Sequence, residues 1–181
     1  MYEDLLSTLN LDQINIFKTI VTSNENDRGG VYFLYGSGGT GKTHVYKTLI
    51  SYFRSKEKIV LSVASSGIAA LLLPGGRTAH STFKIPIELD ESSICNISKR
   101  SNLAKLLLHT SFIIWDEAPI TNRLAFEALD QTLKDLCDND LDFGGKLVMF
   151  GGDFRQILPV VKKPTRGKIV STSIFKSNFL A

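Results

Sequence analysis

Eight consecutive residues carry a pattern that binds the phosphates of a nucleotide. They read GSGGTGKT and match G-x-x-x-x-G-K-[ST] in full. Glycines let backbone N–H groups curl around phosphates, and the N-terminus of a following helix adds partial positive charge. Lys42 can reach the β- and γ-phosphates, and the Thr43 hydroxyl can bind Mg²⁺. The predicted nucleotide-binding residues, here called the P-loop, are Gly36, Ser37, Gly38, Gly39, Thr40, Gly41, Lys42 and Thr43.

Two adjacent acids supply the other groups that hydrolysis of a triphosphate requires. Asp116 and Glu117 directly follow an apolar stretch that is typical of a buried strand. In an open parallel sheet, ligands bind beyond the carboxyl ends of the strands, so both acids should face the P-loop. We expect Asp116 to hold Mg²⁺, directly or through water, and Glu117 to act as the general base. Without a P-loop, a polar strand end at a turn would be the preferred interpretation.

A third element, GGDFRQ, spans residues 151–156 and also follows an apolar stretch. Gln156 could hydrogen-bond the γ-phosphate, and Asp153 could link that position to neighbouring loops. The alternative is a glycine turn followed by a half-buried segment at residues 157–160. The residues alone do not favour one interpretation over the other.

Strands that alternate with helices must position these groups. This alternation predicts an α/β fold of the P-loop NTPase class, a single RecA-like domain over residues 1–181 with helices on both faces of a parallel sheet. Asn10 and Gln13 have the spacing of a capping box at a helix start. An exposed insertion is expected over residues 84–110, where short acidic and basic runs replace the apolar pattern. The predicted strands are residues 31–35, 58–63, 112–115 and 146–150, and the predicted helices are residues 10–22, 42–54, 67–73 and 124–136.

The composition is that of an ordinary globular domain. The chain has 181 residues, of which 43% are hydrophobic and 22% charged. No stretch approaches the ~20 apolar residues of a membrane span, and the acidic start does not resemble a signal peptide. Cys95 and Cys137 form no CxxC pair, which argues against a zinc site or a disulfide framework and favours a reducing intracellular compartment. The net charge of +3 is too small to indicate a nucleic-acid partner.

Four segments in a fixed order resemble one helicase family. These are GSGGTGKT, ASSGIAALLLPGGRTAHSTFKIPI, IIWDEAPI and GGDFRQILPVV. Together they resemble the Pif-type (petite integration frequency) DNA helicases of superfamily one, especially those of plants and rolling-circle transposons. The resemblance runs from about Leu9 to the end of the chain. It implies an ATP- and Mg²⁺-dependent motor that moves 5′ to 3′ on single-stranded DNA, with roles in repair, recombination and telomere maintenance, located in the nucleus or alternatively the mitochondrion.

The resemblance also assigns roles to residues that have simpler explanations. Gln13 matches the glutamine that reads the adenine edge, although the capping box explains it equally well. Ser65 belongs to a segment that lines the DNA path in the family, and a base could stack on His80 or Phe83 in the next such segment. Taken without the resemblance, His80 is a turn residue and Phe83 a core residue. The implied DNA-binding residues are Ser66, Gly67, Thr78, His80 and Phe83.

The chain departs from the family pattern in one respect. Family members continue into a second RecA-like domain with arginine fingers, and no arginine here matches one, Arg155 included. The sequence therefore predicts a first motor domain that does not unwind DNA alone and needs a second domain in cis or trans. A non-catalytic module that binds ATP and DNA is the alternative favoured by the missing finger. A different P-loop enzyme, such as a small kinase, is disfavoured by the GDFRQ element.

Overall fold

The computed structural model of the protein describes residues 2–26 and 29–155. Within these residues, five parallel strands form one sheet in the order β1-β5-β4-β2-β3. Parallel strands need crossover connections, and helices supply most of them here. The strands are β1 (Gly30–Tyr35), β2 (Ile59–Ala64), β3 (Arg77–Thr78), β4 (Thr110–Asp116) and β5 (Leu147–Gly152).

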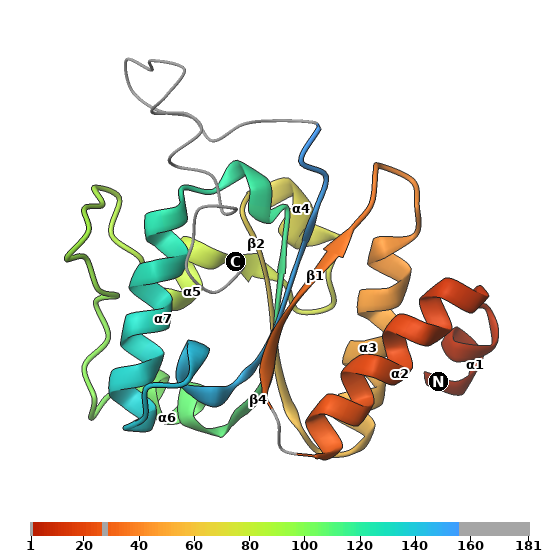
Figure 1. The fold of residues 1–181 in the computed structure, drawn as a ribbon, viewed down its shortest axis with the longest axis horizontal. Helices are drawn as coiled ribbons and strands as arrows, with labels where there is room; N and C mark the ends of the chain where they lie inside the picture. Colours follow the sequence, from red (N-terminus) through yellow and green to blue (C-terminus); the bar gives the residue numbers. More distant parts are fainter. Residues whose placement is uncertain (1, 27–28, 156–181) are drawn as a thin grey trace.

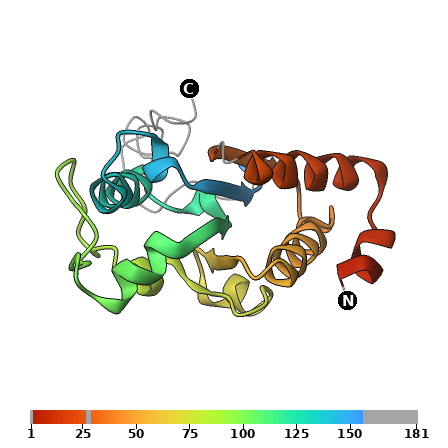
Figure 2. The same cartoon turned by 90° about the horizontal axis from the view of Figure 1, so that it is seen from below.

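Helices cover both faces of the sheet (Figures 1 and 2). On one face lie α1 (Tyr2–Ser7), α2 (Leu11–Glu25) and α3 (Lys42–Ser55), with the short α4 (Gly67–Leu71) at the end of β2. The other face is covered by α5 (Ala79–Phe83), α6 (Asn102–His109) and α7 (Arg123–Cys137). Two 3₁₀ turns complete the described part, η1 (Ala118–Ile120) and η2 (Asp142–Gly145). This architecture confirms the predicted fold class.

Successive residues of the central strand enter two separate hydrophobic cores. Phe112 and Ile114 of β4 pack toward α2 and α3, whereas Ile113 and Trp115 pack toward α5, α6 and α7. This alternation follows from the period of two in a strand, which sends neighbouring side chains to opposite faces. The next residue, Asp116, therefore falls on the α3 face. The sheet geometry thus aims the predicted metal ligand at the helix that follows the P-loop.

The sequence predicted the long elements better than the short ones. All four predicted strands and the long helices are present within a few residues of their expected bounds. The region 84–110 is not simply an exposed insertion, because it contains α6, in which Ala104 and Leu107 are fully buried. Ser101 caps this helix by accepting a hydrogen bond from the backbone N–H of Ala104 at 3.1 Å. Eight residues give too short a periodic pattern to recognise, and α1, α5 and β3 escaped prediction for the same reason.

Candidate functional site

The P-loop connects the end of β1 to the start of α3, at the carboxyl edge of the sheet (Figure 1). Two of its glycines leave little room for a side chain. Gly41 has φ +84°, and a Cβ there would lie 2.5 Å from the side-chain nitrogen of Gln13. A Cβ on Gly36 would lie 2.5 Å from the hydroxyl of Thr40. The loop is also tied to β5, because the Gly36 N–H donates to the carbonyl of Gly152 at 3.3 Å.

Lys42 donates hydrogen bonds to two backbone carbonyls of its own loop. Its Nζ donates to the carbonyl of Gly36 at 2.5 Å and to that of Ser37 at 3.0 Å. No side chain of the described residues caps α3, so its first turn offers backbone N–H groups and the positive end of the helix dipole to an anion. The loop therefore has the geometry of a phosphate site with its lysine already inside it.

Gln13 forms the predicted capping box and also contacts the P-loop. Its backbone N–H donates to the side chain of Asn10 at 2.9 Å, while its Oε1 accepts from the Asn10 N–H at 3.0 Å. The capping box is therefore confirmed. The Gln13 Nε2 donates to the carbonyl of Thr40 at 3.4 Å, so the side chain lies beside the loop. Its contact with adenine stays a prediction.

His44 makes a contact that the sequence did not indicate. Its Nε2 lies 2.7 Å from the hydroxyl of Thr8, in the segment before α2. Because that hydroxyl donates to the carbonyl of Leu5 at 2.8 Å, it accepts from the imidazole. The N-terminal segment is thereby held against the first turn of α3. A lone histidine after a P-loop gives no signal of a partner 36 positions earlier.

Asp116 is buried and bound to α3. Its Oδ1 accepts a hydrogen bond from the hydroxyl of Tyr46 at 3.2 Å. Burial, and then the negative charge and hydrogen bond of Asp116, raise the pKa of Tyr46 well above its usual range. Tyr46 is three positions after Thr43, and residues at this spacing share a helix face. Thr43 and Asp116 are thus brought to the same side of α3, as their predicted roles require.

Glu117 leaves the strand in an unusual conformation. Its φ of +53° places it in the left-handed region, which costs energy for a residue other than glycine. The exposed side chain turns to the loop after β2, where Oε2 accepts from the hydroxyl of Ser66 at 3.0 Å. Residues in such sparsely populated backbone conformations cluster at functional sites. This contact between the predicted base and a predicted DNA-binding residue was not anticipated.

The Mg²⁺ that such a site implies fits the donors present. Thr43 offers a hydroxyl, and Asp116 retains carboxylate oxygen capacity beyond its bond to Tyr46. Among the described residues there is no cluster of three His, Cys, Asp or Glu that could hold an ion by itself. Mg²⁺ usually keeps several waters and is held by one or two protein groups together with substrate phosphates. The donor set suits Mg²⁺ carried in with a nucleotide.

The predicted DNA-binding residues do not all reach the surface. Gly67 and His80 are exposed, and Ser66 and Thr78 are half-buried. Phe83 is fully buried, with its ring centroid 5.9 Å from that of Trp115. The prediction that a base could stack on Phe83 is therefore wrong, and its interpretation as a core residue is confirmed. The alternation of β4 explains this, because Trp115 needs an apolar neighbour on the α5 face.

The third predicted element is only partly described. Asp153 is buried, and its Oδ1 accepts from the backbone N–H of Arg155 at 2.9 Å. The ring of Phe154 stacks on that of Phe33 with centroids 4.6 Å apart. Gln156 lies outside the described residues, so its contact with the γ-phosphate stays a prediction.

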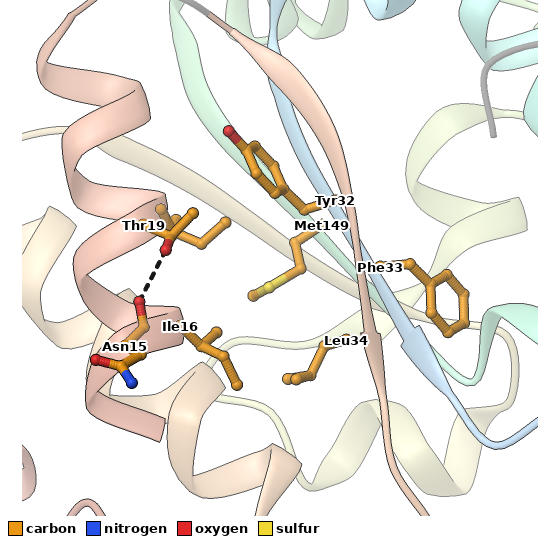
Figure 3. A pocket seen from close by; sticks show the side chains of 8 residues that line it. Asn15, Ile16, Thr19, Tyr32, Phe33, Leu34 and Met149 are labelled. Atoms are coloured by element: carbon orange, nitrogen blue, oxygen red, sulfur yellow. Dashed lines mark hydrogen bonds between the residues drawn. The ribbon is translucent and has the colours of Figure 1, made fainter. Parts of the chain in front are cut away.

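An apolar hollow of about 230 Å³ lies away from these groups, between α2 and β1 (Figure 3). None of its lining residues belongs to the P-loop or to the acid pair, so the hollow is separate from the phosphate site. The open carboxyl edge of the sheet, and not this hollow, carries the predicted chemistry. The hollow is lined by Asn15, Ile16, Thr19, Ile20, Tyr32, Phe33, Leu34 and Met149.

Known proteins are similar to this chain in both sequence and fold. The chain is 38% identical over 130 residues to the ATP-dependent DNA helicase Pif1 of Psychrobacter sp., covering 71% of this chain and 20% of that protein. It is 31% identical over 160 residues to the ATP-dependent DNA helicase RRM3 of Saccharomyces cerevisiae, covering 86% of this chain and 21% of that protein. The chain thus spans about a fifth of the length of these curated relatives.

Solved structures agree with the sequence relatives. Unliganded Pif1 from Bacteroides sp. superposes with a TM-score of 0.73 at 26% identity, covering 95% of this chain and 39% of that one. Pif1 helicase from Bacteroides in complex with ADP-AlF3 and ssDNA gives a TM-score of 0.71 at 29% identity, covering 90% and 38%. The family model described as PIF1-like helicase matches residues 8–180. The chain therefore belongs to the PIF1-like helicase family.

Proposed function

We propose that this chain binds ATP with Mg²⁺ and hydrolyses it in coupling to single-stranded DNA, as the first motor domain of a DNA helicase. The observation that carries the proposal is the connection through Tyr46. A single hydrogen bond of 3.2 Å joins the helix that follows the P-loop to Asp116, the acid at the end of β4. A phosphate loop, a metal-binding acid and a base are the parts that phosphoryl transfer to water requires.

Each group has a defined task in this proposal. Lys42 exchanges its loop carbonyls for the β- and γ-phosphate oxygens, which are stronger acceptors because they are charged. Thr43 and Asp116 would hold Mg²⁺, which when bound would neutralise developing charge on the phosphates. Glu117 accepts a proton from the attacking water. Gln13 reads the adenine edge, and Gln156 reports the γ-phosphate.

Single-stranded DNA is proposed to cross the exposed edge after β2 and β3. Support comes from a relative, the Bacteroides Pif1 helicase solved with ADP-AlF3 and ssDNA. Ser66, Gly67, Thr78 and His80 would contact the strand through backbone N–H groups, hydroxyls and one ring. Although the His80 residue is exposed, its imidazole is partly buried, and this partial burial lowers its pKa, which favours a neutral ring suited to stacking.

Unwinding is proposed only for the whole protein. For the whole protein we also propose movement from 5′ to 3′, roles in repair, recombination and telomere maintenance, and a location in the nucleus. A second RecA-like domain would supply the arginine finger, which is worth roughly 10³–10⁵ in turnover. It would also supply the second grip on the strand that stepping needs. A strand-displacement assay of this chain alone should therefore show no ATP-dependent unwinding.

The decisive experiment measures ATP turnover of the 181-residue chain with and without single-stranded DNA. We expect slow Mg²⁺-dependent turnover that rises when the strand is added. Nucleotide binding without turnover under either condition would favour the alternative, a non-catalytic module that binds ATP and DNA. Absence of nucleotide binding to the folded chain would contradict the proposal itself.

A further inference from the structure

The loop that follows β2, here called the serine loop (Ser65–Gly67), contains two hydroxyls with different surroundings. The Ser65 hydroxyl accepts from the Trp115 indole at 3.0 Å and from the Thr121 hydroxyl at 2.6 Å, and it donates to the Asp116 carbonyl at 3.4 Å. The Ser65 N–H also donates to that carbonyl, at 3.1 Å. Ser65 therefore fixes the serine loop to the end of β4.

Among the described residues, the Ser66 hydroxyl makes two hydrogen bonds, and one of them reaches the proposed base. Its hydroxyl accepts from the backbone N–H of Ala69 at 3.2 Å, which caps α4, and donates to Glu117 Oε2 at 3.0 Å. A hydroxyl has one proton to donate. Ser66 cannot donate to Glu117 and to a phosphate oxygen at the same time, so these two acceptors compete for it.

This contact directs the Glu117 carboxylate toward the loop at the end of β2. In the sheet order β1-β5-β4-β2-β3, the serine loop lies on the opposite side of β4 from β1, which leads into the P-loop. The Glu117 backbone is restrained, since its carbonyl accepts from the Ile120 N–H at 3.3 Å and Ser65 fixes the preceding residue. The exposed side chain can still rotate. The carboxylate can therefore leave Ser66 without movement of the strand.

We propose that Ser66 is a positioning residue that holds Glu117 out of the catalytic position, and that a DNA phosphate releases Glu117 by taking the Ser66 hydroxyl. The inference rests on the proposed function, because it takes Glu117 as the base and the serine loop as part of the DNA path. It adds to that function a means by which DNA binding is coupled to ATP hydrolysis. The Ser66 hydroxyl proton goes either to Glu117, which restrains the base, or to a DNA phosphate, which frees it, so strand binding favours hydrolysis.

A double-mutant cycle on DNA affinity tests the competition without requiring turnover. The affinity of labelled single-stranded oligonucleotides is measured by anisotropy at low salt for wild type, Ser66→Ala, Glu117→Ala and the double variant. Glu117→Ala should tighten binding about 10-fold, the scale of one hydrogen bond to a charged group plus the loss of a repelling charge. In the Ser66→Ala background the same change should tighten binding only about 2-fold, because the charge effect alone remains.

Matched variants separate this coupling from a simple loss of the helix cap. Ser101→Ala removes the same kind of cap from α6, far from Glu117, and should leave DNA affinity and its response to Glu117→Ala unchanged. Ser66→Thr keeps a hydroxyl and a cap, so it should restore the wild-type response. Equal effects of Glu117→Ala in both backgrounds would overturn the inference. Absence of DNA binding by wild type would overturn the proposed function, and with it this inference.

ATP turnover gives a second, independent readout. Without DNA, Ser66→Ala should raise kcat about 3- to 10-fold with little change in KM, because the base is freed while the P-loop is untouched. Addition of single-stranded DNA should then stimulate turnover less than in wild type. A DNA-free kcat in Ser66→Ala at or below the wild-type value would show that Ser66 supports Glu117 and would overturn the proposed restraint.

Discussion

The P-loop and the serine loop lie on opposite sides of the same two acids, and they are built in different ways. The P-loop is shaped by its backbone, with Gly39 and Gly41 at positive φ and the Lys42 ammonium on loop carbonyls. The serine loop has an ordinary backbone and works through the hydroxyls of Ser65 and Ser66. A positive φ largely restricts a position to glycine, whereas a hydroxyl contact can be made by serine or threonine, which are common residues. The first kind of loop therefore leaves a more specific motif in the sequence than the second.

The largest expected effect falls on Glu117, the residue between the two loops. Glu117→Gln should retain ATP and Mg²⁺ binding but lower kcat about 10³-fold, because a carboxamide cannot accept a proton from water. Single-turnover hydrolysis and calorimetric ATP binding on the same preparation measure the two properties separately. Glu127→Gln, a change in a half-buried glutamate of α7, serves as the control. Undiminished hydrolysis in Glu117→Gln would assign the base to another group.

The next effect should be confined to the P-loop. Lys42→Ala is expected to weaken ATP binding about 10- to 100-fold, the scale of losing charge-assisted hydrogen bonds to phosphate. The affinity for single-stranded DNA without nucleotide should not change, because the serine loop is separate from Lys42. Lys47→Ala, an exposed lysine of α3, controls for the loss of a positive charge. Isothermal calorimetry on folded Lys42→Ala with wild-type ATP affinity would contradict the P-loop assignment.

Two glycines extend the comparison to stability. A Cβ on Gly151 would lie 1.6 Å from the Tyr46 hydroxyl oxygen and 3.4 Å from Asp116 Oδ1, whereas a Cβ on Gly67 would meet nothing within 4 Å. Gly151→Ala should therefore lower the free energy of unfolding by about 2 kcal/mol, as overpacked core substitutions do. Gly67→Ala, in the first turn of α4, should be neutral or slightly stabilising. Urea unfolding of both variants checks this, and equal midpoints would mean that the nucleotide edge is as open as the serine loop.

The features that the sequence predicted differ from those that it missed in the same way as the P-loop differs from the serine loop. The parallel sheet, the P-loop and the Asn10–Gln13 capping box depend on residue types at fixed local spacing, and all three are present. The contacts of Tyr46 with Asp116 and of Ser66 with Glu117 join residues 70 and 51 positions apart, and no local pattern specifies such partners. Phe83 shows the opposite case. Its apolar character predicted a core position, and the family resemblance suggested an exposure that packing against Trp115 excludes.

The smallest expected effect concerns Tyr46, which joins the nucleotide edge to Asp116. Its pKa in the folded protein is raised above that in the unfolded chain, where tyrosine titrates near pH 10. The unfolded state therefore loses its proton first as the pH rises. The stability that the neutral hydroxyl contributes is complete below about pH 10 and declines above it, by up to about 1.4 kcal/mol per pH unit. Tyr46→Phe lacks this proton, so its stability should decline less between pH 8 and pH 11.

Tyr52 also has a raised pKa, but it is present in both proteins, so its contribution cancels in the difference between them. At pH 7, Tyr46→Phe should cost about 1 kcal/mol through the lost hydrogen bond to Asp116. Urea midpoints of wild type and Tyr46→Phe, measured across this pH range, give both quantities. The gap between the proteins should narrow as the pH rises past 10, because only wild type pays the cost of keeping the buried phenol protonated. A gap that is constant with pH would mean that Tyr46 titrates as an exposed phenol and does not hold Asp116 in solution.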